Sequence, residues 1–276
     1  MGTWRGGAAR VAACLIMTAA VTPGLVPDAS GSAAERNTRL PFGPGEECRF
    51  SVKFGIVRAG SASMSVEPAP PGAPGDALLL VSTARSSRFF STFFMVEDRV
   101  ESVWSTRSRL PIRFEKTVHE GNYRKHESVR FDQEAGRAVY AGGDTVDMVP
   151  GSQDVLSAFY YVRTLDLDLG STVAIPNHAD KKNYPLDVRV LGRETIDVEA
   201  GRFRCIVVEP LLKTAGLFKQ EGRLTIWLTD DARRLPVLMK SKVAVGSITA
   251  ELESYRAGVP AIAPPPGPAM GEGSGR

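Results

Sequence analysis

Residues 112–131 read IRFEKTVHEGNYRKHESVRF. Apolar and polar side chains alternate along this segment on both sides of Gly121-Asn122, which predicts a β-hairpin with a two-residue turn. In that register Lys116 lies opposite Glu127, and the apolar residues of both strands share one face. A hairpin with one apolar and one polar face is typical of an antiparallel sheet that covers a core on one side.

The same alternation recurs along the chain, with Gly- or Asp-rich turns between the runs. The clearest further runs are residues 50–56, 60–66, 184–190, 203–207 and 224–228. Residues 152–165 instead space their apolar side chains as a helix does, with Ser152 as the expected N-cap and Gln153 and Asp154 in the first turn. The sequence therefore predicts an all-β, mainly antiparallel fold: a curved sheet or barrel-like β domain with one short helix.

The N-terminal residues have the pattern of a secretory signal peptide. Arg5 and Arg10 precede an uncharged apolar run at residues 11–21, and small residues follow it, so residues 1–34 are expected to be removed on export. An uncleaved anchor is the alternative, although the run is too short to span a bilayer as a stable helix. The mature chain is expected to be periplasmic or envelope-associated, with no transmembrane segment.

The rest of the chain divides by composition. Residues 35–44 are expected to form a linker, and the Pro/Gly/Ala-rich residues 257–276 a disordered tail. Residues 45–256 then form a single β-rich domain, which is long enough to bury a sizeable core.

Composition and motifs exclude several function classes. The formal net charge is +3 with both signs interspersed, and no basic stripe with interleaved aromatic residues points to a nucleic-acid partner. The sequence contains no Gly-x-Ser-x-Gly elbow, phosphate loop, dinucleotide fingerprint or zinc motif. We therefore predict no catalytic residue and no cofactor.

Two pairs of residues are candidates for a metal site or a disulfide. His119 and His126 lie on the same face of the hairpin and could bind a metal ion if further ligands converged on them, but a solvated polar face explains them as well. Cys48 and Cys205 both lie in strand-like apolar runs. An oxidising compartment would permit a disulfide between them, and two free buried thiols are the alternative.

Residues 86–95 read SSRFFSTFFM, with aromatic residues at a spacing that forms one face of a short helical turn. This cluster is either an apolar lid or mouth that touches a lipid-like ligand or partner, or a loop that folds its aromatic rings onto the core. The residues predicted to bind a ligand are Phe89, Phe90, Phe93, Phe94 and Met95, together with Phe159 and Tyr160 of the predicted helix.

Six short segments, taken in order and spacing, resemble the bacterial domain-of-unknown-function family 3108, a family of exported envelope proteins. They are FGIVRAG (54–60), DVLSAFYYVR (154–163), AGRFRC (200–205), IWLTDD (226–231), LPV (235–237) and GSITAEL (246–252). The resemblance spans essentially the whole predicted domain and implies a β-rich, barrel-like fold. It implies no catalytic residues.

Export, the β pattern and the Phe-rich segment favour a non-enzymatic binder or carrier of a lipid-like or hydrophobic envelope ligand. One alternative is an interaction module that docks on an envelope protein or polysaccharide through a sheet edge or the Phe-rich segment. A hydrolase of envelope polymer is a further alternative, which would need a nucleophile, a base and an orienting group within hydrogen-bond reach.

Overall fold

The computed structural model describes residues 39–212, 223–242 and 246–262, so the predicted signal peptide lies outside the described residues. Within these ranges the chain forms one fourteen-stranded antiparallel sheet and two helices. In chain order the elements are β1 (Glu47–Phe54), β2 (Val57–Pro68), β3 (Ala77–Ser86), α1 (Arg88–Ser91), β4 (Glu97–Ser105), β5 (Pro111–Glu120), β6 (Tyr123–Asp132), β7 (Arg137–Tyr140), β8 (Thr145–Asp147), α2 (Val155–Val162), β9 (Thr172–Ala179), β10 (Lys182–Val198), β11 (Gly201–Leu212), β12 (Leu224–Thr229), β13 (Pro236–Lys242) and β14 (Ser247–Arg256).

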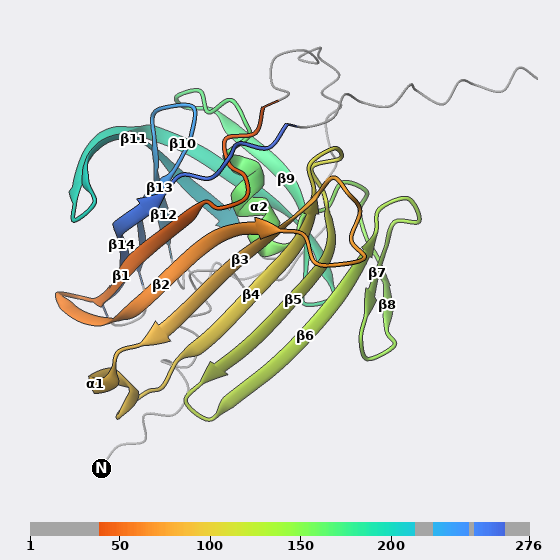
Figure 1. Ribbon diagram of the computed structural model, residues 1–276, viewed down its shortest axis with the longest axis horizontal. Helices are drawn as coiled ribbons and strands as arrows, with labels where there is room; N and C mark the ends of the chain where they lie inside the picture. The colour runs from red at the N-terminus through yellow and green to blue at the C-terminus, as the bar shows by residue number, and fades with distance from the viewer. Residues whose placement is uncertain (1–38, 213–222, 243–245, 263–276) are drawn as a thin grey trace, which may run out of the picture.

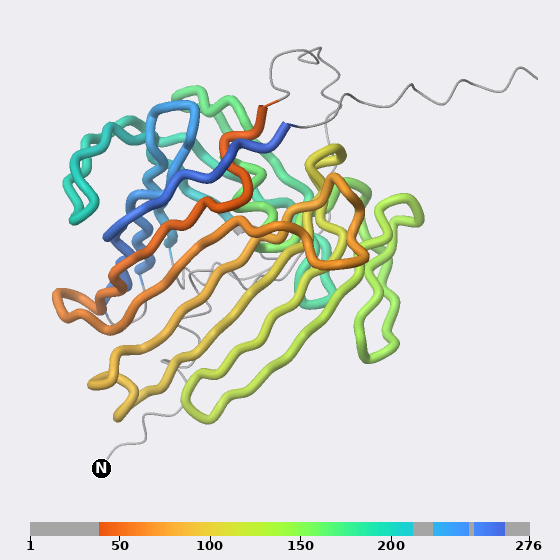
Figure 2. The backbone as a smooth tube through the Cα atoms, in the orientation of Figure 1, coloured from red at the N-terminus to blue at the C-terminus, as the bar shows by residue number. Residues whose placement is uncertain are grey.

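The strands follow the order β8-β7-β6-β5-β4-β3-β2-β1-β14-β13-β12-β11-β10-β9 across the sheet. Figure 1 and Figure 2 show that the sheet curls, so that its two halves face one another with α2 between them. The outermost strands β8 and β9 are not paired with each other. Side chains join the two edges instead, with Lys125 Nζ 2.7 Å from Asp180 Oδ1 and Tyr140 Oη 2.9 Å from His178 Nε2. The predicted all-β fold with a curved, barrel-like sheet is confirmed.

The hairpin of β5 and β6 has the predicted register, with Lys116 opposite Glu127. Gly121 occupies the first turn position with φ 56°, a left-handed conformation that glycine adopts without steric cost. The ring of Phe94 covers this turn, because a Cβ added at Gly121 would lie 2.9 Å from the ring edge. Both the backbone angle and the neighbouring ring therefore require glycine there.

Helix α2 lies within the predicted segment, but it begins later than expected. The N-cap is Asp154 rather than Ser152: the Asp154 carboxylate accepts hydrogen bonds from the N–H groups of Leu156 and Ser157, and the Ser157 hydroxyl accepts from the Asp154 N–H. This reciprocal capping box satisfies N–H groups that a helix leaves unpaired at its start. The Ser152 hydroxyl instead donates to the Val149 carbonyl. The second helix, the four-residue α1, lies in the Phe-rich segment, where the aromatic spacing indicates a short helical turn.

The two ends of the domain extend further than composition predicted. Leu40 and Phe42, in the expected linker, are 2% and 1% exposed and belong to the core. The segment that contains them is hydrogen-bonded to the start of the expected tail, through Leu40 N–H to the Ala261 carbonyl and Ala261 N–H to the Phe42 carbonyl. The sequence did not indicate this pairing, because the tail is rich in Pro and Gly. The two segments are also short and lie more than two hundred residues apart in the chain.

Candidate functional site

Helix α2 occupies one end of the interior of the curled sheet. At its first turn the Asp154 carboxylate also accepts a 2.6 Å hydrogen bond from the Ser102 hydroxyl of β4. Burial raises the pKa of Asp154 to about 6, against the opposing effect of the hydrogen bonds from Ser102 and Ser157. The helix is therefore fixed to β4 by a buried carboxyl group.

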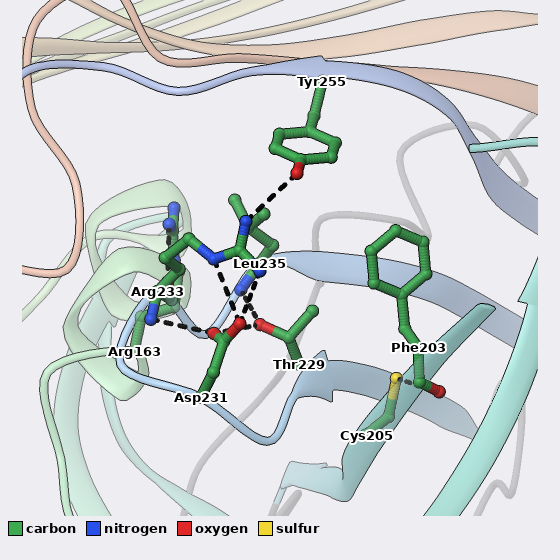
Figure 3. Close-up of polar contacts among 8 residues, drawn as sticks. All are labelled: Arg163, Phe203, Cys205, Thr229, Asp231, Arg233, Leu235 and Tyr255. Atoms are coloured by element: carbon green, nitrogen blue, oxygen red, sulfur yellow. Dashed lines mark hydrogen bonds and ion pairs between the residues drawn. The ribbon is translucent and has the colours of Figure 1, made fainter. Parts of the chain in front are cut away.

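At the other end of α2, Arg163 forms a buried ion pair with Glu46. Its guanidinium donates two hydrogen bonds, of 2.7 and 2.9 Å, to the two carboxylate oxygens, and both side chains are almost fully buried. The guanidinium carbon also lies 4.9 Å from the ring centroid of Phe42. A third hydrogen bond, to the Arg233 carbonyl, connects α2 to the turn between β12 and β13 (Figure 3).

Beside α2 the interior contains a partly enclosed cavity of about 90 Å³. Helix α2, which contacts β3, β4 and β9, forms one part of its wall. Strands from both halves of the sheet and the helix direct apolar side chains into the space. Six that define it are Met64, Val100, Val118, Phe159, Leu186 and Ile226.

Two charged residues, Lys116 and Asp98, also line this apolar cavity. Lys116 is only 8% exposed and lies between Phe114 and Val118 on the inward face of β5. Its positive charge acts on the carboxyl group of Asp98, which lines the same cavity. Glu127, its predicted partner across the hairpin, is paired at 2.5 Å with Lys125 instead.

Asp98 lies on the neighbouring strand β4 and accepts a 3.0 Å hydrogen bond from the His119 N–H. Burial raises the pKa of Asp98, against the opposing effects of the His119 N–H, a hydrogen bond with Glu120 and the positive charge of Lys116. The cavity therefore combines a hydrocarbon-like wall with one ammonium group and one carboxyl group whose ionised form burial disfavours.

Only part of the predicted ligand-binding set lies at this cavity. Phe159 lines it, whereas Tyr160 is buried against Phe42 and its hydroxyl donates to the Ser65 carbonyl. The Phe-rich segment lies at α1, away from the cavity wall. Its residues do not share one environment: Phe89 and Phe93 are 68% and 74% exposed, while Phe90, Phe94 and Met95 are half-buried. The interpretation that all these rings fold onto the core is therefore wrong for Phe89 and Phe93.

The candidate metal and disulfide residues do not form sites in this structure. His119 and His126 are diagonal neighbours on the hairpin as predicted, but among the described residues no third metal-ligating side chain converges on them. The His126 ring bonds instead to the Thr117 hydroxyl at 3.2 Å. Cys48 and Cys205 are free and buried, so the structure has the free thiols rather than the disulfide. Burial raises the pKa of each thiol to about 12.

Sequence reasoning missed Lys116 and Asp98 as site residues. The sequence did contain one signal, because Lys116 lies on the apolar face of the predicted hairpin. An ion pair with Glu127 was expected to account for it, so Lys116 was not considered a site residue. Asp98 carried no comparable signal, because its inward orientation depends on the pairing of β4 with β5.

Several of the six segments that were quoted for the family resemblance lie close together around the turn between β12 and β13 (Figure 3). The Asp231 carboxylate accepts from the Thr229 hydroxyl and from the Arg233 side chain, and the Leu235 N–H donates to Thr229. The guanidinium of Arg233 also donates to the Tyr255 hydroxyl at 3.1 Å. The side chains of Thr229, Asp231 and Arg233 bond to one another or to neighbouring strands, which indicates a structural role for these segments.

Comparisons with known proteins agree with the fold. A family model described as "Protein of unknown function (DUF3108)" matches residues 49–253, and no curated protein matches the chain. A β-barrel-like protein of a domain of unknown function, DUF1849, from Brucella abortus is similar in structure, with a TM-score of 0.52 and 10% identity over 77% of this chain and 97% of its own. A candidate exported protein with a YmcC-like fold from Bacteroides fragilis has a TM-score of 0.35 and 12% identity over 79% of this chain and 98% of its own. The first likeness concerns the fold alone.

Proposed function

The chain belongs to the DUF3108 family, and we propose that it binds a lipid-like or hydrophobic envelope ligand in the cavity beside α2, without catalysing a reaction. The observation that carries this proposal is an apolar cavity inside an otherwise closely packed core. Protein interiors normally leave few voids larger than a water molecule, and a dry apolar cavity favours hydrocarbon over water.

The size of the cavity limits the ligand. Pockets for drug-sized molecules usually measure about 300–1,000 Å³, whereas an engineered apolar cavity of about 150 Å³ takes up benzene. A cavity of about 90 Å³ is therefore suited to a slender group such as the end of one acyl chain. Each methylene that enters it contributes about 0.8 kcal/mol.

The end of the sheet opposite α2 carries exposed apolar side chains that could guide such a ligand. Ile56, in the turn between β1 and β2, is 96% exposed, and Phe89 and Phe93 follow β3 at the same end of the antiparallel strands. Exposed apolar clusters mark contacts with partners or lipid surfaces. Export to the periplasm or envelope is part of the proposal and is supported by the sequence of residues 1–34.

The test is native mass spectrometry of the protein purified from a periplasm without detergent, followed by organic extraction. We expect a reproducible bound hydrophobic mass. Ala84→Leu, which places a larger side chain in the cavity wall, should remove that mass, whereas Ala174→Leu on an exposed position of β9 should retain it. A ligand-free wild-type protein that also fails to take up decanol when it is added would contradict the proposal.

An interaction module is the second candidate, and the exposure of Phe89 and Phe93 favours it. A Phe89→Ser, Phe93→Ser variant separates the two functions, because these rings do not line the cavity. Loss of binding to a defined envelope partner with unchanged decanol uptake would favour the module.

A further inference from the structure

Large apolar side chains are exposed at the end of the sheet that lies away from α2. Ile56 is 96% exposed, and Phe89 and Phe93 are 68% and 74% exposed. Figure 1 shows the β1–β2 turn, α1 and the β5–β6 turn side by side along this end. We call them together the hairpin rim, which consists of residues 55–56, 87–96 and 121–122. Exposed apolar side chains gathered at one end of a protein mark a contact surface.

The three parts of the hairpin rim are connected by backbone hydrogen bonds. The Ser87 N–H donates to the Ala59 carbonyl of β2, and the Gly121 N–H donates to the Met95 carbonyl, both at 2.7 Å. These bonds join the segment between β3 and β4 to the turn on each side of it. The Ser87 hydroxyl also caps α1 by accepting from the Phe90 N–H. The exposed rings therefore stand on an ordered backbone, and docking costs little conformational entropy.

The aromatic residues of the hairpin rim have two different roles. The half-buried ring of Phe94 covers the turn at Gly121, where an added Cβ would lie 2.9 Å from the ring. Phe89 and Phe93 instead contact one another edge to face, with their ring centroids 5.5 Å apart, and remain open to solvent. One ring thus holds the rim together, and the other two form a protruding apolar pair.

Two exposed arginines accompany these apolar side chains. Arg88 lies in α1, and Arg124 lies just after the β5–β6 turn. Among the described residues no carboxylate lies within ion-pair distance of either guanidinium, and Arg124 donates to two backbone carbonyls of its own turn. Glu97, the exposed carboxylate next to the rim, is paired at 3.0 Å with Arg85. The hairpin rim therefore presents uncompensated positive charge beside apolar side chains.

We propose that the hairpin rim docks on the surface of an anionic lipid bilayer. Ile56, Phe89 and Phe93 insert below the headgroups, and Arg88 and Arg124 bind lipid phosphates. Apolar side chains gain free energy by leaving water for the acyl boundary, and the negative surface potential attracts arginines that remain at headgroup level. This docking goes beyond the proposed function and is independent of it, because none of the five side chains lines the cavity beside α2.

The shape of the hairpin rim favours a bilayer over a folded protein as the partner. Ile56 stands on a turn of its own, and its 96% exposure means that it packs against almost nothing, including the Phe89–Phe93 pair. A protein partner would need a separate complementary pocket for each protruding group. The fluid interface of a bilayer accommodates an uneven set of apolar tips without such pockets.

The experiment measures co-sedimentation of the protein, purified from a periplasm without detergent, with two kinds of vesicle. One contains phosphatidylcholine alone, and the other contains equal parts of phosphatidylcholine and anionic phosphatidylglycerol. Wild-type protein should bind the anionic vesicles at least about tenfold more tightly at low salt. Arg88→Gln, Arg124→Gln should remove most of that preference. Arg113→Gln, Arg130→Gln removes the same charge from cross-strand neighbours near the other end of the β5–β6 hairpin and should behave as wild type.

A second pair of variants tests the apolar contribution. Phe89→Ser, Phe93→Ser should weaken binding to the anionic vesicles by at least about tenfold, because two inserted rings are lost. Val259→Ser, Ile262→Ser is the matched control, since these side chains are 76% and 75% exposed but lie away from the rim. All four side chains are exposed, so the urea midpoints of both variants should equal that of wild type.

Insertion itself is measured by tryptophan fluorescence. Phe89→Trp places a reporter in the hairpin rim, and its emission should shift to shorter wavelength when anionic vesicles are added. Val259→Trp is the control and should show no shift. Trp104 and Trp227 contribute the same background to both proteins.

The outcomes separate membrane docking from the other functions. Weaker vesicle binding in both rim variants, with decanol uptake unchanged, would support the docking surface. Vesicle binding that both rim variants retain would overturn it and would place the contact elsewhere, for example in residues 11–21. A wild-type protein that binds neither kind of vesicle would also overturn it and would leave the rim to the interaction module. Binding without an emission shift in Phe89→Trp would contradict insertion of the rings.

Discussion

His178 lies at the seam between the two edges of the curled sheet, in a chain of hydrogen bonds with a defined direction. The Lys181 N–H donates to the Tyr140 hydroxyl at 2.8 Å, so the hydroxyl proton is free to donate to His178 Nε2. His178 Nδ1 then donates to the Asn183 side-chain oxygen at 2.7 Å. Burial lowers the pKa of His178, in agreement with a neutral ring that accepts at Nε2 and donates at Nδ1. Both ring nitrogens are engaged, so His178 connects β7 to the hairpin of β9 and β10.

Removing the Tyr140 hydroxyl tests this seam. Tyr140→Phe leaves the Lys181 N–H and His178 Nε2 without partners, and we expect a loss of about 1–3 kcal/mol in the free energy of unfolding. Urea denaturation at pH 7.5 measures it. Tyr123→Phe is the control, because that ring is 49% exposed and its hydroxyl can bond to water. Equal effects of the two substitutions would contradict the role of the seam.

Asp154 gives the protein a pH dependence of known sign. In the unfolded chain the carboxyl loses its proton near pH 3.8, whereas burial in the folded protein raises its pKa to about 6. Between these values the folded state binds more protons than the unfolded state. The stabilising contribution of Asp154 is therefore greatest at low pH and falls as the pH rises through this window, by about 3 kcal/mol in total.

The Asp154→Asn variant isolates this effect. Asparagine caps a helix about as well as aspartate, but it has no charge to bury. We expect the free energy of unfolding of the variant, relative to wild type, to rise by up to about 3 kcal/mol between pH 4 and pH 7. Urea denaturation across that range measures the difference, and other titrating groups cancel in it. A difference that stays constant with pH would show that Asp154 does not titrate in this way.

At the scale of elements, α2 is held at its last turn by the ion pair of Arg163 with Glu46. Arg163→Met leaves the Glu46 carboxylate buried without its partner, which should lower the free energy of unfolding by about 3–5 kcal/mol. The double variant Glu46→Leu, Arg163→Met removes both charges and should recover a large part of that loss. Urea denaturation of the single and double variants measures the coupling.

An exposed ion pair provides the control for these Arg163 and Glu46 variants. Arg202 and Asp197 are hydrogen-bonded across the turn between β10 and β11, with side chains 73% and 65% exposed. Water and salt screen such pairs, so Arg202→Met should change the free energy of unfolding by less than about 1 kcal/mol. A similarly small effect of Arg163→Met would mean that the buried pair does not anchor α2.

The elements that could be predicted are those whose signals are local. The register of the 112–131 hairpin follows from a two-residue turn and side chains close in sequence, and the helix follows from apolar spacing within one segment. The pairing of Arg163 with Glu46 joins residues 117 apart, and the inward orientation of Asp98 depends on neighbouring strands. The cavity also depends on how far α2 fills the curled sheet, which no local pattern specifies.

At the scale of the whole molecule, Phe42 connects parts of the chain that composition assigned to different regions. Its ring lies 5.7 Å from Trp104 of β4 and 4.9 Å from Tyr160 of α2, measured between centroids. Its backbone carbonyl accepts from Ala261, near the other end of the described chain. The segment before β1 therefore covers the end of the barrel-like sheet that contains α2.

This arrangement predicts that Phe42 stabilises the domain as strongly as a residue of a central strand. Phe42→Ala should lower the free energy of unfolding by about 3–5 kcal/mol, because it leaves a cavity between β4 and α2. Ile56→Ala is the control, since Ile56 is 96% exposed and its truncation should change stability by no more than about 0.5 kcal/mol. If both variants unfold at the same urea concentration, residues before β1 act as a linker after all, and the domain is limited to the central residues 45–256.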